Sequence, residues 1–174
     1  MKNILIIIVL ITLSFAGRSQ STICPALQAF TGEWRYISGQ DEIRVYLRAG
    51  DYTILEGSGT TIAKLWGWHE YKRAGTVVES NYANRFMTLP TNSGNAVANS
   101  YSISLQMPQC APAGNKLIGN IDDISQCNEM KMVTIIFNTA QNQLIWEQRH
   151  SQGFGFGTNC KGMTLPRTFV LTKQ

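Results

Sequence analysis

Apolar and polar residues alternate along most of the chain after about residue 30. From 42 to 48, for example, Ile43, Val45 and Leu47 are separated by Arg44 and Tyr46. Period two is typical of half-buried β-strands, because successive side chains of a strand point to opposite sides. The sequence contains no long apolar stripe at helical spacing.

The alternation and the turn signals between segments predict eight or nine strands. These are expected at about 32–37, 42–48, 61–71, 76–81, 101–107, 115–120, 130–138, 143–149 and 167–173. Tight hairpins are predicted at Ser38–Asp41 and Lys72–Gly75, and a long mobile loop at 89–99. An all-β antiparallel meander with no helix to cover it must close or fold on itself to bury its apolar side. We therefore expect a closed barrel with a short helix at 24–30 plugging one end, and a two-sheet sandwich is the alternative.

The N-terminus has the layout of a secretory signal peptide. A short positive start, Met1–Asn3, precedes an apolar run at 4–13 and then small residues. The apolar run is shorter than the roughly 20 residues that a membrane-spanning helix needs. Cleavage is expected after Ala16 or Ser19, so the division is a signal peptide at 1–19 and one β domain at 20–174. The mature protein is predicted to be periplasmic or secreted, with no membrane span.

The charge balance argues against a nucleic-acid partner. The whole chain carries 15 basic and 11 acidic residues, for a net charge of +4. Removing the predicted signal peptide takes away Lys2 and Arg18 and lowers this charge to +2. The remaining basic residues are scattered, whereas nucleic-acid binding usually needs a clustered basic face.

Four cysteines in a predicted exported chain indicate disulfide bonds. Four cysteines allow three pairings, and we favour Cys110–Cys127, which closes a short loop, together with Cys24–Cys160. The second pair would tie together the two ends of a domain whose first and last strands are neighbours. No metal site is expected, since the sequence has neither Cys-x-x-Cys nor a Cys/His cluster at zinc spacing.

The first predicted strand opens with Phe30-Thr31-Gly32-Glu33-Trp34, and its Gly-x-Trp resembles the start of lipocalin-like barrels. The resemblance implies structural roles for Gly32 and for Trp34, which would close one barrel end. It also implies that an arginine from a late strand, Arg149 or Arg167, packs on the Trp34 ring as a cation–π contact.

The order of motifs over 28–174 also looks like a domain-of-unknown-function family of small exported bacterial proteins. The motifs include Leu65-x-Gly67, Lys116–Gly119, Val133–Phe137 and the closing Leu165–Lys173. His69 departs from this pattern, since an aromatic residue is expected there. That resemblance implies export and fold but no activity.

Two aromatic segments are the candidate ligand-binding residues. Trp66 and Trp68 share one face of their predicted strand and Tyr71 lies on the other. The tryptophans are either core or pocket lining, which we favour, or exposed platforms for carbohydrate or protein. In the glycine-rich segment 153–159, Phe154 and Phe156 either pack on the barrel end, which we favour, or meet an apolar ligand or partner.

Catalytic signals are weak, and we expect no catalytic residue and no cofactor. His69 and His150 have no partner at a recognised spacing, and both are predicted to be surface or rim residues. No Gly-x-Ser-x-Gly nucleophile elbow is present. The favoured hypothesis is a non-catalytic binding protein for a small apolar ligand. The alternatives are a protein- or carbohydrate-interaction module of the cell envelope that uses exposed aromatics and, last, a hydrolase.

Overall fold

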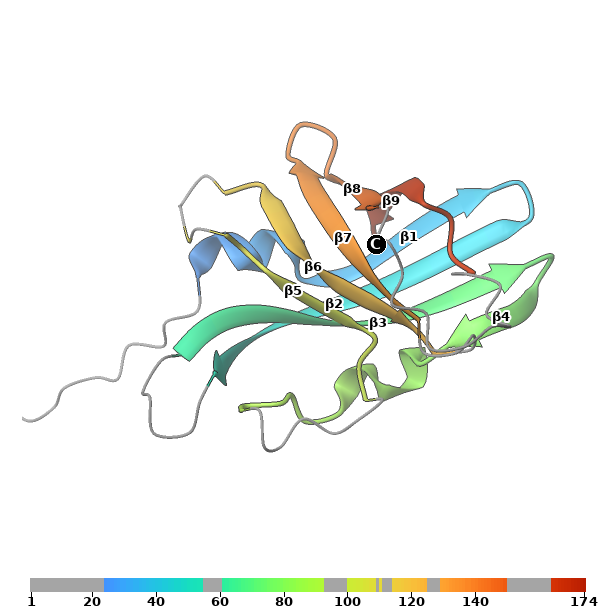
Figure 1. Cartoon of the computed structure of the whole chain (residues 1–174). Helices are drawn as coiled ribbons and strands as arrows, with labels where there is room; N and C mark the ends of the chain where they lie inside the picture. Colours follow the sequence, from blue (N-terminus) through green and yellow to red (C-terminus); the bar gives the residue numbers. More distant parts are fainter. Residues whose placement is uncertain are drawn as a thin grey trace, which may run out of the picture.

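The computed structural model describes residues 24–54, 61–92, 100–108, 110, 114–124, 129–149 and 164–174 (Figure 1). Within these residues it has nine strands and two short 3-10 helices. In chain order they are η1 (Pro25–Phe30), β1 (Gly32–Ser38), β2 (Asp41–Thr53), β3 (Thr61–Arg73), β4 (Thr76–Ser80), η2 (Tyr82–Phe86), β5 (Ile103–Gln106), β6 (Lys116–Asp123), β7 (Glu129–Asn138), β8 (Gln143–Gln148) and β9 (Thr168–Lys173).

The strands form a closed antiparallel barrel. Their order is β2-β1-β9-β8-β7-β6-β5-β3-β4, and β2 also pairs with β3 over the full length of both strands. This pairing closes eight strands on themselves and leaves β4 as an extra strand on the edge of β3. The predicted meander barrel is therefore confirmed, and the sandwich alternative is wrong.

The predicted hairpin turns are confirmed, and their backbone angles explain the residues found there. Gly39 has φ of +58° in the turn between β1 and β2. Ala74 and Gly75 have φ of +51° and +79° in the turn between β3 and β4. Such left-handed pairs match the right-handed twist of the flanking strands. In the loop predicted at 89–99, residues 93–99 lie outside the described residues.

The inward positions of the strands fill the barrel with one contiguous apolar cluster. Ile43, Val45 and Leu47 of β2 are buried, as their alternation predicts. The predicted short helix is confirmed as η1, which places Leu27 and Phe30 in the same cluster. The cluster also contains Trp34, Leu65, Tyr71, Ile103, Leu105, Leu117, Ile121, Val133, Ile135, Leu144, Trp146, Phe169 and Leu171.

The two ends of the barrel differ in what lies there. The helix end holds η1 and the starts of β1 and β3, and the hairpin end holds the β1–β2 and β3–β4 turns. Because β9 runs antiparallel to β1, it begins at the hairpin end and finishes beside Trp34 at the helix end. Residues that precede β9 therefore start on the far side from η1.

Candidate functional site

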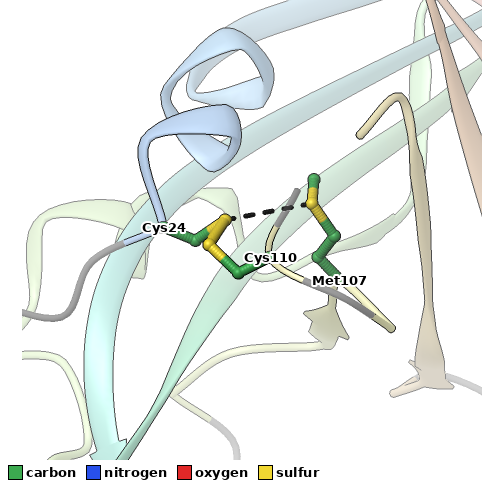
Figure 2. The surroundings of a disulfide bond; sticks show 3 residues. All are labelled: Cys24, Met107 and Cys110. Carbon is green, nitrogen blue, oxygen red and sulfur yellow. Dashed lines mark hydrogen bonds between the residues drawn. A yellow bond between two sulfur atoms is a disulfide. The ribbon is translucent and has the colours of Figure 1, made fainter. Parts of the chain in front are cut away.

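A disulfide bond joins the start of η1 to the chain that follows β5. Cys24 stands directly before η1, and its carbonyl accepts the backbone N–H of Leu27 at 2.9 Å. Its sulfur bonds to Cys110, 86 residues further along the chain. Figure 2 shows the Met107 side chain beside this bond, with its sulfur 3.9 Å from that of Cys24. Three sulfur atoms therefore meet at the helix end of the barrel.

The Cys24–Cys110 bond contradicts the predicted pairings Cys24–Cys160 and Cys110–Cys127, which are wrong. The first and last strands are neighbours, as that prediction assumed, but they run in opposite directions. Thr164, which precedes β9, hydrogen-bonds to Asp123 at the hairpin end, whereas Cys24 lies at the helix end. Cys127 and Cys160 lie outside the described residues.

A groove of about 410 Å³ opens beside the disulfide. Its lining comes from the segment before η1, the start of β3 and the segment after β5. The residues are Cys24, Thr61, Ile62, Ala63, Gln106, Met107, Pro108 and Cys110. Ala63 and Met107 also pack against the barrel core, so the groove floor is continuous with that core.

The groove is lined mainly by apolar side chains and by polarisable sulfur atoms. Ile62, Ala63, Met107, Pro108 and the disulfide supply carbon and sulfur, and only Thr61 and Gln106 supply polar side chains. Methionine adapts its shape to irregular partners and contacts aromatic rings favourably. Sequence reasoning missed these residues; the signal available was Met107, which ends an alternating strand just before Pro108 and Cys110.

Trp66 and Trp68 lie on the outer side of the barrel but are only 1% exposed. Inward Leu65 and Tyr71 alternate with them and belong to the core. The tryptophans are covered by η2, which packs on β2 and β3, and by Ser100 and Tyr101, which contact Trp68 and Trp66. The alternative of exposed platforms is therefore wrong. Both tryptophans are buried, as favoured, but under a second layer outside the barrel rather than in its interior.

Specific contacts hold this covering layer in place. The Arg48 guanidinium donates to the carbonyls of Arg85 and Met87, at 3.1 and 2.7 Å, and lies over the Trp68 ring. The Trp68 indole N–H donates to the carbonyl of Ser100. The layer includes η2, a helix that no pattern in the sequence predicted.

The cation that packs on the Trp34 ring is not one of the predicted arginines. Trp34 is buried, and its indole N–H donates to the carbonyl of Phe30 at 2.8 Å. The group over its ring is the Lys173 ammonium, 5.1 Å from the ring centre. Arg149 and Arg167 are exposed, so the expectation that one of them packs on Trp34 is wrong. Lys173 lies there because β9 pairs Lys173 directly with Trp34.

Gly32 and Tyr71, two more of the predicted site residues, have structural roles in the barrel. Gly32 begins β1 with φ of +107°, a conformation that other residues rarely adopt. The Tyr71 hydroxyl donates to the Asp41 carboxylate at 2.8 Å, and the same carboxylate also binds Arg73. Burial and then this hydrogen bond raise the pKa of Tyr71. The remaining candidates, Phe154, Phe156 and His150, lie outside the described residues.

A buried polar cluster lies inside the hairpin end. His69 is 0% exposed, so the prediction of a surface or rim residue is wrong. Its Nε2 lies 2.5 Å from Glu79 Oε1 and its Nδ1 lies 2.6 Å from Ser102 Oγ. Glu79 also accepts a hydrogen bond from the Thr164 hydroxyl at 2.5 Å. The cluster thus joins β3, β4, the start of β5 and the approach to β9.

Hydrogen bonds connect every member of this cluster. The Ser102 hydroxyl lies 3.2 Å from Asn81 Oδ1, to which it can donate, and 2.6 Å from Nδ1 of His69. Burial by itself raises the pKa of Glu79, but hydrogen bonds with His69, Thr164 and Asp123 and electrostatic attraction to His69 outweigh it and lower that pKa from 4.5 to about 2. Glu79 is therefore ionised at neutral pH, and its Oε1 lies beside Nε2 of His69.

Serine, histidine and glutamate in contact raise the question of nucleophilic catalysis. Ser102 is 1% exposed, and its hydroxyl lies within hydrogen-bond distance of both Asn81 and His69. A catalytic serine must give its hydrogen to its base and must also reach a substrate. Because Ser102 and His69 are both buried, a substrate does not reach the Ser102 hydroxyl in this arrangement.

The described part of the chain lacks a metal-binding cluster and a membrane-spanning helix. In it, no group of three or more His, Cys, Asp or Glu residues is arranged to hold a metal ion. None of the helices described there is long and apolar enough to cross a membrane.

The fold and the groove together define a closed β-barrel protein with one end capped by a helix and a disulfide. A family model, "Family of unknown function (DUF6705)", matches residues 1–174. The chain therefore belongs to this family, which confirms the predicted membership in a family of unknown function. Comparison with curated proteins and with solved structures found no match.

Proposed function

We propose that this protein is a non-catalytic binding protein for a small apolar ligand, held in the groove beside Cys24–Cys110. The observation that carries the proposal is the groove of about 410 Å³ at the mouth of the barrel. Ligand sites are usually concave, about 300–1,000 Å³ and mostly apolar. The barrel interior is occupied by packed side chains, which favours the mouth over the interior as the ligand site.

The lining suggests the kind of ligand. Ile62, Ala63, Met107 and the disulfide all line the groove, and none of its lining residues carries a charged side chain. Burying the hydrocarbon surface of a ligand against such a lining contributes about 25 cal/mol of binding free energy per Å² removed from water. The thioether and disulfide sulfurs favour an aromatic or conjugated ligand over a sugar or an ion.

The same proposal places the protein outside the cytoplasm. Structural disulfides persist in oxidising compartments, and the Cys24–Cys110 bond fits the predicted signal peptide, whose residues lie outside the described part of the chain. N-terminal sequencing of the protein from its native host should find a start after Ala16 or Ser19. An intact Met1 on the exported protein would contradict this part of the proposal.

The binding proposal is tested with the neutral fluorescent probe N-phenyl-1-naphthylamine. Ile62→Glu puts an unpaired charge in the groove, so we expect it to weaken probe binding by about tenfold or more. The matched control is Met132→Glu, the same change at a β7 position that is already 47% exposed, which should shift the dissociation constant less than about twofold. Thermal melts verify that both variants are folded.

The result that overturns the proposal is equally concrete. Absence of saturable probe binding by the unaltered protein, or equal weakening by both variants, would remove the groove as the ligand site. Native mass spectrometry of freshly purified protein adds a second readout, since a bound apolar molecule should be lost from Ile62→Glu and kept in Met132→Glu.

A further inference from the structure

The barrel wall is incompletely paired between its first and last strands. In the described strands, β1 and β9 form only two residue pairs, Trp34 with Lys173 and Arg35 with Thr172. Continuing the same register would pair Ile37 with Val170, but the described strands do not do so. On their other sides, all of β1 pairs with β2, and β9 pairs with β8 from Thr168 to Thr172. The seam between them is therefore open toward the hairpin end.

The backbone groups of Ile37 face this open seam. In β1 the carbonyls of Glu33 and Arg35 point to β9, since they accept from the Gln174 N–H at 3.0 Å and the Thr172 hydroxyl at 3.2 Å. Alternate residues of a strand direct their backbone groups to the same side. The N–H and C=O of Ile37 therefore point into the seam.

The same alternation applies to β9. The Arg167 carbonyl accepts the Gln148 N–H at 2.7 Å and so points to β8. Odd-numbered residues here face β8, and Thr168, Val170 and Thr172 face β1. Val170 thus presents a second donor and acceptor across the seam from Ile37.

Side chains close the seam inside and leave a groove outside. The rings of Tyr36 and Phe169 meet inside, 5.4 Å apart. Outside lies a groove of about 350 Å³, lined by Arg35, Tyr36, Ile37, Gln143, Val170, Thr172 and Gln174. Ile37 is 60% exposed and Val170 is 40% exposed, so the groove offers two apolar β-branched side chains to a partner.

The charges beside the groove favour an acidic partner. Arg35 and Arg44 both bind the Glu42 carboxylate, at 2.9 and 3.2 Å, on the outer side of the β1–β2 hairpin. Two guanidinium groups share one carboxylate, which leaves one excess positive charge. Arg35 lines the groove two residues before Ile37 and therefore on the same face.

We propose that this seam binds an extended peptide of a partner protein by strand addition. The peptide pairs with the free N–H and C=O of Ile37, places a β-branched apolar side chain against Val170, and two residues away places an acidic side chain near Arg35. Main-chain hydrogen bonds supply affinity in this mode and alternate side chains supply specificity. The unpaired edge of Tyr36–Ser38 spans about 10 Å, enough for three residues. This site is separate from the groove at Cys24–Cys110.

The test uses the full chain and two synthetic capped hexapeptides. One is acetyl-Ser-Asp-Thr-Val-Thr-Ser-amide, and the other has the same side chains with alternate backbone nitrogens methylated, which prevents strand pairing. Binding is followed by NMR, through amide shifts and through hydrogen exchange of the Ile37 N–H. We expect only the first peptide to bind, and to slow Ile37 exchange by about tenfold.

Two variants separate strand addition from simple surface contact. Ile37→Pro removes the N–H that faces the seam and should weaken the peptide about tenfold. Ile37→Val keeps that N–H and should change affinity less than about threefold. Should Ile37→Pro not fold, Arg35→Gln and the methylated peptide provide the comparison, with salt-dependent weakening expected for the arginine variant.

Three outcomes overturn the inference. They are equal binding of both peptides, no change at Tyr36–Ser38 and Val170 with millimolar peptide, or seam shifts that grow with protein concentration alone. The last would show that a second copy of the chain occupies the seam. None of these outcomes bears on the apolar groove, whose probe assay is independent.

Discussion

Replacing Glu79 with glutamine should show how strongly the barrel depends on its buried polar cluster. The substitution keeps the size of the side chain but removes the charge that faces His69 at 2.5 Å. A carboxyl pKa held at about 2 instead of 4.5 corresponds to about 3 kcal/mol of stability at neutral pH. Removing one partner of a buried pair typically costs about 3–5 kcal/mol, so both arguments give a loss of about 3 kcal/mol.

The pH dependence provides the sharper test. Because the folded-state pKa of Glu79 is lowered, its stabilising contribution is present above about pH 4.5 and is lost as the pH falls toward 2. Glu79→Gln cannot titrate there, so the difference between the two proteins should be largest at pH 7 and shrink toward pH 2.5. Unfolding in urea, followed by the fluorescence of the four buried tryptophans, measures this difference at several pH values.

Glu42→Gln is the matched control. Glu42 binds Arg35 and Arg44 at the surface, where its side chain is 24% exposed, and surface pairs contribute at most about 1 kcal/mol. A loss below about 1 kcal/mol for Glu79→Gln at pH 7, or a loss independent of pH, would refute the lowered pKa of Glu79.

Two further predictions concern covalent and steric constraints. Replacing both Cys24 and Cys110 with serine should lower the free energy of unfolding by about 4 kcal/mol, because the bond closes a loop of 86 residues. Mass analysis of cyanylated cysteines checks which cysteines are paired. An unchanged free energy of unfolding in the double variant would contradict the Cys24–Cys110 bond. Gly119→Ala should cost about 3 kcal/mol or more, since a Cβ there would lie 2.0 Å from the backbone oxygen of Ser104. Gly39→Ala, where nothing lies within 4 Å and only the backbone angle is strained, should cost about 1 kcal/mol; equal losses in urea unfolding would refute the close approach at Gly119.

The strands were predictable because their signal is local. The inward residues of β2 and β7 alternate in the sequence as they do in the barrel, and Gly39 and Gly75 mark turns that need a positive φ. The proposed site was not predictable in the same way. Ile62 and Met107 line one groove although 45 positions separate them in the printed sequence, and neither residue type alone indicates a ligand.

Sequence by itself determined the positions of most strands, the hairpin turns and the short helix before β1, and it favoured closure of the sheet over a sandwich. Each of these follows from alternation or from backbone preference within a few residues. Only the tertiary structure decided that Cys24 meets Cys110, that His69 is buried with Glu79, and that Trp66 is covered from outside. These depend on strand direction and on a second layer over the barrel, which bring together residues that no local pattern connects.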